Sequence, residues 1–127
     1  MSEFNVGVCN DNEVIKEIFK EYSQIKGAES CFVSFDKELA DLDGYYKGGA
    51  LLLGSEDGTP VGSIAIRKID DAICEAKRLF IKPEFRGKGY ARVMLNTMLD
   101  KVLIYLFNES KKFIDSSYST ASSCMII

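Results

Sequence analysis

The spacing of hydrophobic positions predicts the first elements of the chain. Residues 3–8 alternate weakly between polar and apolar side chains, which indicates a strand. Over residues 11–25 the apolar side chains recur every three or four positions, as on the buried face of a helix, and Asp11 stands where an N-cap is expected. Residues 34–42 predict a second, shorter helix.

The later segments predict a series of strands followed by one long helix. Residues 50–57 and 60–69 are strand-like runs joined by an Asp-Gly turn, and residues 72–81 follow as a third strand. Over about residues 87–108 the apolar side chains return to the helical spacing. Residues 112–119 predict a last strand.

The predicted order of elements, β-α-α-β-β-β-α-β, indicates an α/β fold of mixed α+β type with an antiparallel meander before the long helix. The 127 residues fit one domain around one core, spanning residues 1–127. The net charge of −3 provides no basic field for nucleic acid, and no run of about 18 apolar residues could cross a membrane. Because the amino terminus lacks a signal-peptide pattern, we expect a cytoplasmic protein.

The chain contains no histidine, which removes histidine-dependent nucleophilic schemes and histidine-ligated metals. Its four cysteines are far apart in sequence and form no C-x-x-C pair, so we expect reduced thiols and no metal site. Acid–base chemistry would therefore depend on Glu, Asp, Lys, Tyr or Cys side chains.

The turn "RGKGYA", residues 86–91, combines two glycines with cationic side chains at the start of the long helix. The first N–H groups of a helix attract anions, and glycine lets an anion approach the backbone closely, so the turn predicts a phosphate site. A Walker loop is absent, and a dinucleotide fingerprint would need a glycine where Arg92 stands. A glycine loop capped only by solvated basic residues is the structural alternative.

The run "FIKPEFRGKGYARVML", residues 80–95, resembles motif A of the GNAT family of N-acetyltransferases, whose signature R/Q-x-x-G-x-G/A is filled by Arg86, Gly89 and Ala91. The resemblance extends over about residues 3–119. It implies a central, mostly antiparallel sheet with flanking helices, and acetyl-CoA (coenzyme A) as the cofactor, with its pyrophosphate on the turn and its pantetheine arm on the preceding strand. The cofactor-binding residues that it implies are Leu79, Phe80, Ile81, Arg86, Gly87, Lys88, Gly89, Tyr90, Ala91 and Arg92.

The resemblance implies an acyltransferase that moves the acetyl group of acetyl-CoA to a primary amine of a small molecule or protein. In the family a strand carboxylate often stands where Glu75 stands, which makes Glu75 the candidate general base. The alternative is a structural glutamate paired with a neighbouring Lys or Arg, of which Lys77 is the closest in sequence. Without a bulge, Glu75 and Lys77 would share one face of the strand with Leu79 and Ile81.

Tyr45 and Tyr46 lie in a glycine-rich segment where the family places substrate-contacting residues, so they are candidates for the acceptor pocket; the alternative is that they cover the core. Cys74 could instead suggest an acyl-cysteine, but no histidine is present to activate it.

The segment after the long helix departs from the family pattern, which continues with a further helix and strand. In the family a tyrosine of that helix protonates the leaving thiolate, and Tyr118 is the candidate for this general acid here. A sheet edge left uncovered favours self-association, so we expect a homodimer. The functional alternative is a truncated, non-catalytic relative that binds coenzyme A.

Overall fold

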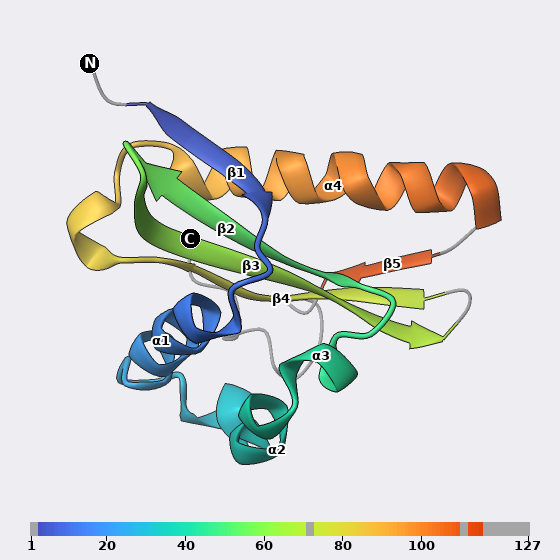
Figure 1. Cartoon of the computed structure of the whole chain (residues 1–127), viewed down its shortest axis with the longest axis horizontal. Helices are drawn as coiled ribbons and strands as arrows, with labels where there is room; N and C mark the ends of the chain where they lie inside the picture. The colour runs from blue at the N-terminus through green and yellow to red at the C-terminus, as the bar shows by residue number, and fades with distance from the viewer. Residues whose placement is uncertain (1–2, 71–72, 110–111, 116–127) are drawn as a thin grey trace.

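The structure is a computed structural model that describes residues 3–70, 73–109 and 112–115. At its centre is a five-stranded sheet with the order β1-β2-β3-β4-β5 (Figure 1). Neighbouring strands from β1 to β4 are antiparallel, whereas β5 lies parallel to β4. The strands are β1 (Phe4–Val8), β2 (Ala50–Glu56), β3 (Thr59–Asp70), β4 (Ile73–Ile81) and β5 (Lys112–Asp115).

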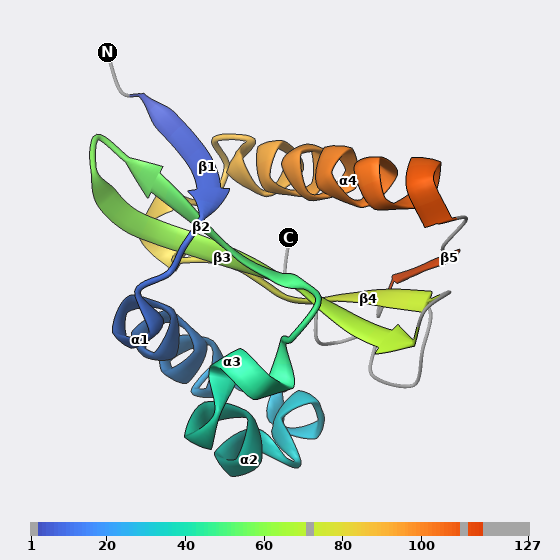
Figure 2. The same cartoon turned by 45° about the vertical axis from the view of Figure 1, so that its right-hand side comes forward.

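Helices cover both faces of the sheet (Figures 1 and 2). The long helix α4 lies along one face, and α1, α2 and α3 lie on the other. This arrangement confirms the predicted fold class. None of the helices in the described part of the chain is long and apolar enough to cross a membrane. The helices are α1 (Asn12–Ser23), α2 (Phe35–Ala40), α3 (Leu42–Tyr45) and α4 (Tyr90–Glu109), with short 3₁₀ turns η1 (Glu29–Phe32) and η2 (Pro83–Phe85).

The first helix forms as its sequence predicts. The Asp11 side chain accepts hydrogen bonds from the backbone N–H groups of Glu13 and Val14, at 3.1 and 3.4 Å, and so satisfies donors that have no partner inside the helix. The predicted apolar face of α1 is buried against the sheet. Its buried residues are Ile15, Ile18, Phe19 and Tyr22.

Each face of the sheet has its own core. On one face Met94 and Met98 of α4 pack against strand side chains that include Leu52, Ile64 and Leu79. On the other face α1 and the segment from η1 to α3 (residues 29–45), here called the helical lobe, pack against Ala65 and Phe80 among others. Because a strand alternates its side chains between faces, one strand supplies both cores.

A bulge in β4 changes this alternation in the middle of the strand. The pairing with β3 shifts between Ser63 and Ala65, and Arg78 opposite this shift has a φ of 62°. As a result, Lys77 and Arg78 both contact the helical lobe, whereas Leu79 returns to the α4 core. The condition for Glu75 and Lys77 to share a face with Leu79 and Ile81, a strand without a bulge, is therefore not met.

Two cysteine side chains match the expected chemistry and one does not. Cys9 and Cys74 are free thiols, and Cys74 is buried. Cys31 is disulfide-bonded, so the expectation of reduced thiols is wrong for this residue.

Candidate functional site

The glycine turn lies between η2 and the first residue of α4. Gly87 and Gly89 both have a φ of 82°, in the left-handed region that side chains with a Cβ rarely adopt. A Cβ at either position would meet no atom within 4 Å. The glycines are therefore required by the backbone conformation, and the space in front of the turn is open to a ligand.

A pocket of about 370 Å³ opens at this turn. It brings together most of the residues that the family resemblance implies for cofactor binding. Backbone N–H groups at the start of a helix and the nearby guanidinium groups make such a pocket favourable for an anion. The residues that line it are Ile81, Phe85, Arg86, Gly87, Gly89, Tyr90, Ala91 and Arg92.

Glu56, at the end of β2, holds two side chains of the turn and was not predicted from the sequence. Its carboxylate accepts a hydrogen bond from the Tyr90 hydroxyl and forms an ion pair with Lys88 at 3.2 Å. The hydrogen bond from Tyr90 lowers the pKa of the Glu56 carboxyl and raises the pKa of Tyr90 to about 12. The Tyr90 ring also stacks on Phe4, with centroids 3.9 Å apart. Lys88 is thus already partly neutralised within the protein.

Arg86 lies differently from Lys88, because it contacts the end of β4. Its Nε donates a hydrogen bond to the Ile81 carbonyl at 2.8 Å, and its guanidinium carbon lies 5.5 Å from the centroid of the Phe80 ring. The first residue of the family signature therefore links the turn to the strand that precedes it.

In the described part of the chain, the strand β4 has a free edge close to this turn. β5 pairs only with residues 73–76 of β4, and among the described residues no strand covers that side of residues 77–81. On its other side β4 stays paired with β3, through Ser63 with Phe80 and Gly62 with Ile81. The backbone of Leu79, Phe80 and Ile81 thus lies beyond the part of β4 that β5 covers in the described residues, as a ligand that pairs with an open strand edge requires.

Glu75 lies on the face of β4 that carries Lys77, just before the bulge. Its Oε1 is buried and has no hydrogen-bond partner among the described residues. The Lys77 ammonium instead donates to the Tyr45 hydroxyl at 2.9 Å. Among the described residues Glu75 forms no ion pair with Lys77 or with another Lys or Arg. One of its carboxylate oxygens is therefore left for another proton donor.

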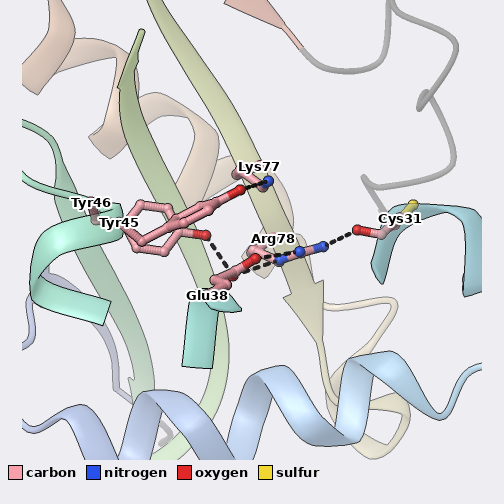
Figure 3. A network of polar contacts seen from close by, with 6 residues as sticks. All are labelled: Cys31, Glu38, Tyr45, Tyr46, Lys77 and Arg78. Carbon is pink, nitrogen blue, oxygen red and sulfur yellow. Dashed lines mark hydrogen bonds and ion pairs between the residues drawn. The ribbon is translucent and has the colours of Figure 1, made fainter. Parts of the chain in front are cut away.

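The two candidate acceptor tyrosines have different surroundings (Figure 3). Tyr45 is partly buried, and the Arg67 guanidinium carbon and the Lys77 ammonium lie 4.4 and 5.1 Å from its ring centroid. Tyr46 is 4% exposed and donates a hydrogen bond to Glu38 at 2.7 Å. Burial, together with the adjacent Glu38, raises the pKa of Tyr46. The candidate general acid, Tyr118, lies outside the described residues.

A larger cavity, of about 710 Å³, lies at the opposite edge of the sheet. Among the predicted site residues it includes Tyr46 but neither Glu75 nor any residue of the glycine turn. Its size alone does not make it the reaction site, because Glu75 and the residues of the glycine turn do not line it.

Comparison with known proteins agrees with this geometry. Residues 12–108 match the model of the acetyltransferase (GNAT) family, so the chain belongs to this family. An uncharacterized N-acetyltransferase of Schizosaccharomyces pombe is 35% identical over 86 residues, which cover 65% of this chain and 53% of that protein. The chain thus spans about half the length of this curated relative.

Solved structures share the fold. An acetyltransferase of the GNAT family from Staphylococcus aureus Mu50 has a TM-score of 0.64 at 17% identity, over 95% of this chain and 79% of that one. A GNAT family acetyltransferase from Elizabethkingia anophelis, solved with acetyl-CoA bound, has a TM-score of 0.50 at 16% identity, over 88% of this chain and 63% of that one.

Proposed function

We propose that this chain is an N-acetyltransferase that transfers the acetyl group of acetyl-CoA to a primary amine. The observation that carries the proposal is the glycine-turn pocket at the start of α4, directly beside the free edge of β4. Membership of the acetyltransferase (GNAT) family and the acetyl-CoA bound to a structural neighbour support it.

The residues of the turn fit the phosphate groups of this cofactor. The N–H groups of residues 87–91 would donate to the pyrophosphate, whereas that of Arg86 already donates to the Pro83 carbonyl at 3.3 Å. The Arg86 and Arg92 side chains would add positive charge, and the backbone of residues 79–81 would pair with the pantetheine arm. When bound, acetyl-CoA supplies an acyl group activated as a thioester. The open space in front of Gly87 and Gly89 is what an approaching phosphate needs.

Glu75 would act on the acceptor. An amine with the pKa of a lysine, about 10.4, is protonated at pH 7, and its deprotonation there costs about 4–5 kcal/mol. In the proposed step Glu75 would take one proton from the ammonium form of the acceptor, and the freed amine would bond to the thioester carbonyl carbon. As the C–S bond broke, the sulfur would leave with the bonding electrons and take up a proton. The nitrogen would give its second proton back to the group that supplied the sulfur, so that the products are an N-acetyl amine and a thiol, with the remaining proton on Glu75. We predict that Tyr118 donates the proton that the sulfur takes up.

The backbone N–H of Leu79 or Phe80 would stabilise the negative charge that develops on the thioester oxygen. A donor held in place by the sheet needs no reorganisation when this charge appears, which is how such donors accelerate acyl transfer. The hydrogen bond from the Ser63 hydroxyl to the Arg78 carbonyl, at 2.9 Å, fixes the peptide that precedes Leu79.

The test has two parts. Calorimetry with acetyl-CoA measures binding, and release of free thiol with a panel of primary amines measures turnover. The proposal expects saturable binding and amine-dependent thiol release. Binding without release would instead favour a non-catalytic relative that holds coenzyme A, and absence of both would reject the pocket as a cofactor site.

The expected homodimer also stays a prediction. Light scattering coupled to size exclusion at micromolar protein would show it as a doubled mass, and a monomer there would contradict it.

A further inference from the structure

Two cationic side chains converge on Tyr45, beside the candidate base. The Lys77 ammonium donates to the Tyr45 hydroxyl at 2.9 Å and lies 5.1 Å from the ring centroid. The Arg67 guanidinium carbon lies 4.4 Å from the same centroid. All three side chains are partly buried. Tyr45 therefore holds two positive charges in one place on the face of the sheet that carries Glu75.

No carboxylate of the described residues neutralises either cation. Within residues 3–70, 73–109 and 112–115, no ion pair within 4 Å involves Arg67 or Lys77, although Lys16, Lys20 and Lys88 each have an acidic partner. Bringing positive charges together in a partly desolvated place is unfavourable unless an anion compensates them. The cluster is thus complementary to a negatively charged group.

Glu75 lies within reach of both cations and pairs with neither. It stands directly opposite Arg67 across the β3–β4 ladder, where Cβ atoms are about 5 Å apart, and two positions before Lys77 on the same strand. Its buried Oε1 has no partner in the described part of the chain. Among the described residues, a carboxylate without an ion pair and two cations without an ion pair therefore stand on neighbouring positions of β3 and β4.

We infer that the amine acceptor carries a carboxylate within a few bonds of its amino group, as a free amino acid does. This inference rests on the proposed function. The ammonium end of such a molecule is complementary to Glu75, and its carboxylate is complementary to Arg67 and Lys77. Arg67 is suited to this role because its planar guanidinium can bind a carboxylate through two parallel hydrogen bonds.

A polycationic acceptor fits this surface poorly. To bring one amine to Glu75 it would have to place its remaining positive charges near Arg67 and Lys77, and like charges at such spacing repel. A neutral amine would leave both cations uncompensated. The arrangement therefore distinguishes among acceptors by the charge next to the amine.

The experiment compares matched acceptors with the full chain and acetyl-CoA. For each of several amino acids, kcat/KM is measured for the amino acid, its carboxamide and its decarboxylated amine, which differ only in the group that would meet Arg67. We expect at least one amino acid to be preferred by about tenfold or more over both counterparts, since hydrogen bonds to charged groups contribute roughly tenfold to a hundredfold.

Variants test whether Arg67 causes the preference for the amino acid over its carboxamide. Arg67→Gln should reduce kcat/KM for the amino acid by about tenfold or more while leaving that for its carboxamide within about twofold, and the affinity for acetyl-CoA should not change. Lys26→Gln removes the same charge from an exposed position and is the control, expected to change neither. A purely structural role of Arg67 would reduce both acceptors equally and would overturn the inference.

The remaining outcomes also test the inference and the proposed function. Equal or better transfer to carboxamides, decarboxylated amines or polyamines overturns the inference while leaving the proposed function intact. Acetyl-CoA binding without transfer to any amine rejects the proposed function. In that case calorimetric titration of the amino acids into the coenzyme A-loaded protein still tests the cation cluster, because binding that Arg67→Gln abolishes would support it and absence of binding would overturn it.

Discussion

Arg78 of β4 and Glu38 of α2 form a two-pronged ion pair inside the protein. The Arg78 Nε donates to Glu38 Oε2 at 2.9 Å, and its terminal nitrogen Nη2 donates to Oε1 at 2.6 Å (Figure 3). The two residues are 2% and 1% exposed. A third donor of the same guanidinium, Nη1, reaches the Cys31 carbonyl at 2.9 Å, and Tyr46 donates to Glu38. The charges are therefore almost fully compensated by hydrogen bonds.

This pair joins the helical lobe to the bulge of β4. Arg78 is the residue whose φ of 62° marks the bulge, a conformation that costs a side-chain-bearing residue about 1–3 kcal/mol. The contacts to Glu38 and Cys31, and the packing of the guanidinium 4.0 Å from the Phe32 ring centroid, hold the residue in that conformation. Because Tyr46, the residue after Tyr45, also donates to Glu38, the pair ties this end of the helical lobe to β4.

Removal of one partner of this pair should be costly. Arg78→Ala leaves the Glu38 carboxylate buried without its cation, and we expect the free energy of unfolding to fall by about 3–5 kcal/mol in urea titrations. The double variant Arg78→Met with Glu38→Leu should recover part of that loss, because neither charge remains. Lys20→Ala removes the exposed pair with Glu17 and should cost less than about 1 kcal/mol. If Arg78→Ala lowered the free energy of unfolding by no more than Lys20→Ala does, the Arg78–Glu38 pair would not hold the helical lobe against β4.

Buried tyrosines should make stability fall at high pH. Burial raises the pKa of Tyr22 to about 12 from its ordinary value of 10.0, while the charge of Arg78 opposes this shift. The stabilisation by the protonated phenol is fully present below pH 10 and is lost as the pH rises toward 12, because the unfolded chain ionises first. Between these values the free energy of unfolding should fall by about 1.4 kcal/mol per pH unit for this group. Tyr22→Phe should reduce the slope measured by urea titration at pH 9, 10 and 11; an unchanged slope would contradict this.

Local sequence patterns were sufficient for much of the fold and for the cofactor turn. The apolar spacing of residues 11–25 and the Asp11 cap place α1 correctly, because both act within one helix. The glycine turn is also local, since left-handed φ values and a helix start are properties of consecutive residues. This is why the pocket at residues 86–92 contains most of the residues expected there.

What the sequence did not show depends on contacts between distant segments. The bulge at Arg78 arises where β4 meets β3, and no spacing in residues 72–81 marks it. Glu38 and Glu56 read as ordinary charged positions, yet one is buried with Arg78 and the other is bonded to Lys88 and Tyr90. The one available signal was Arg78, a cationic residue inside an apolar strand. A buried arginine requires a partner, so its presence indicates a buried acidic residue elsewhere in the chain.

Two glycines with the same conformation allow a matched test of the turn. Gly89 and Gly58 have φ values of 82° and 86°, and a Cβ at either would meet no atom within 4 Å. Gly89→Val and Gly58→Val should therefore lose similar stability, about 1–2 kcal/mol. Only Gly89→Val should weaken acetyl-CoA binding in calorimetry, by about tenfold or more, because only its side chain stands in front of the helix start. Equal affinities in the two variants would reject the turn as the pyrophosphate site.

Two cationic side chains of the turn, Lys88 and Arg92, should contribute differently to the binding of acetyl-CoA. Lys88 is paired with Glu56 at 3.2 Å, whereas Arg92 is exposed and lines the pocket without an ion pair to any described residue. We expect Arg92→Gln to weaken acetyl-CoA binding several-fold and Lys88→Gln by less than about twofold, since Glu56 already offsets the Lys88 charge. Calorimetry at two salt concentrations checks this, and a larger loss for Lys88→Gln would show that the Glu56 pair opens when the ligand binds.

Glu75→Gln separates acceptor chemistry from cofactor binding. The substitution keeps the shape of the side chain but removes the proton acceptor, so kcat/KM for the amine at pH 7 should fall by about 10²–10⁴-fold while acetyl-CoA affinity stays unchanged. The loss should shrink as the pH approaches the pKa of the amine, because more of the acceptor is then already deprotonated. Glu21→Gln, an exposed position on α1, is the matched control. If Glu75→Gln keeps full kcat/KM across this pH range, Glu75 is not the base, and its unpaired Oε1 would serve only to orient the ammonium group of the acceptor.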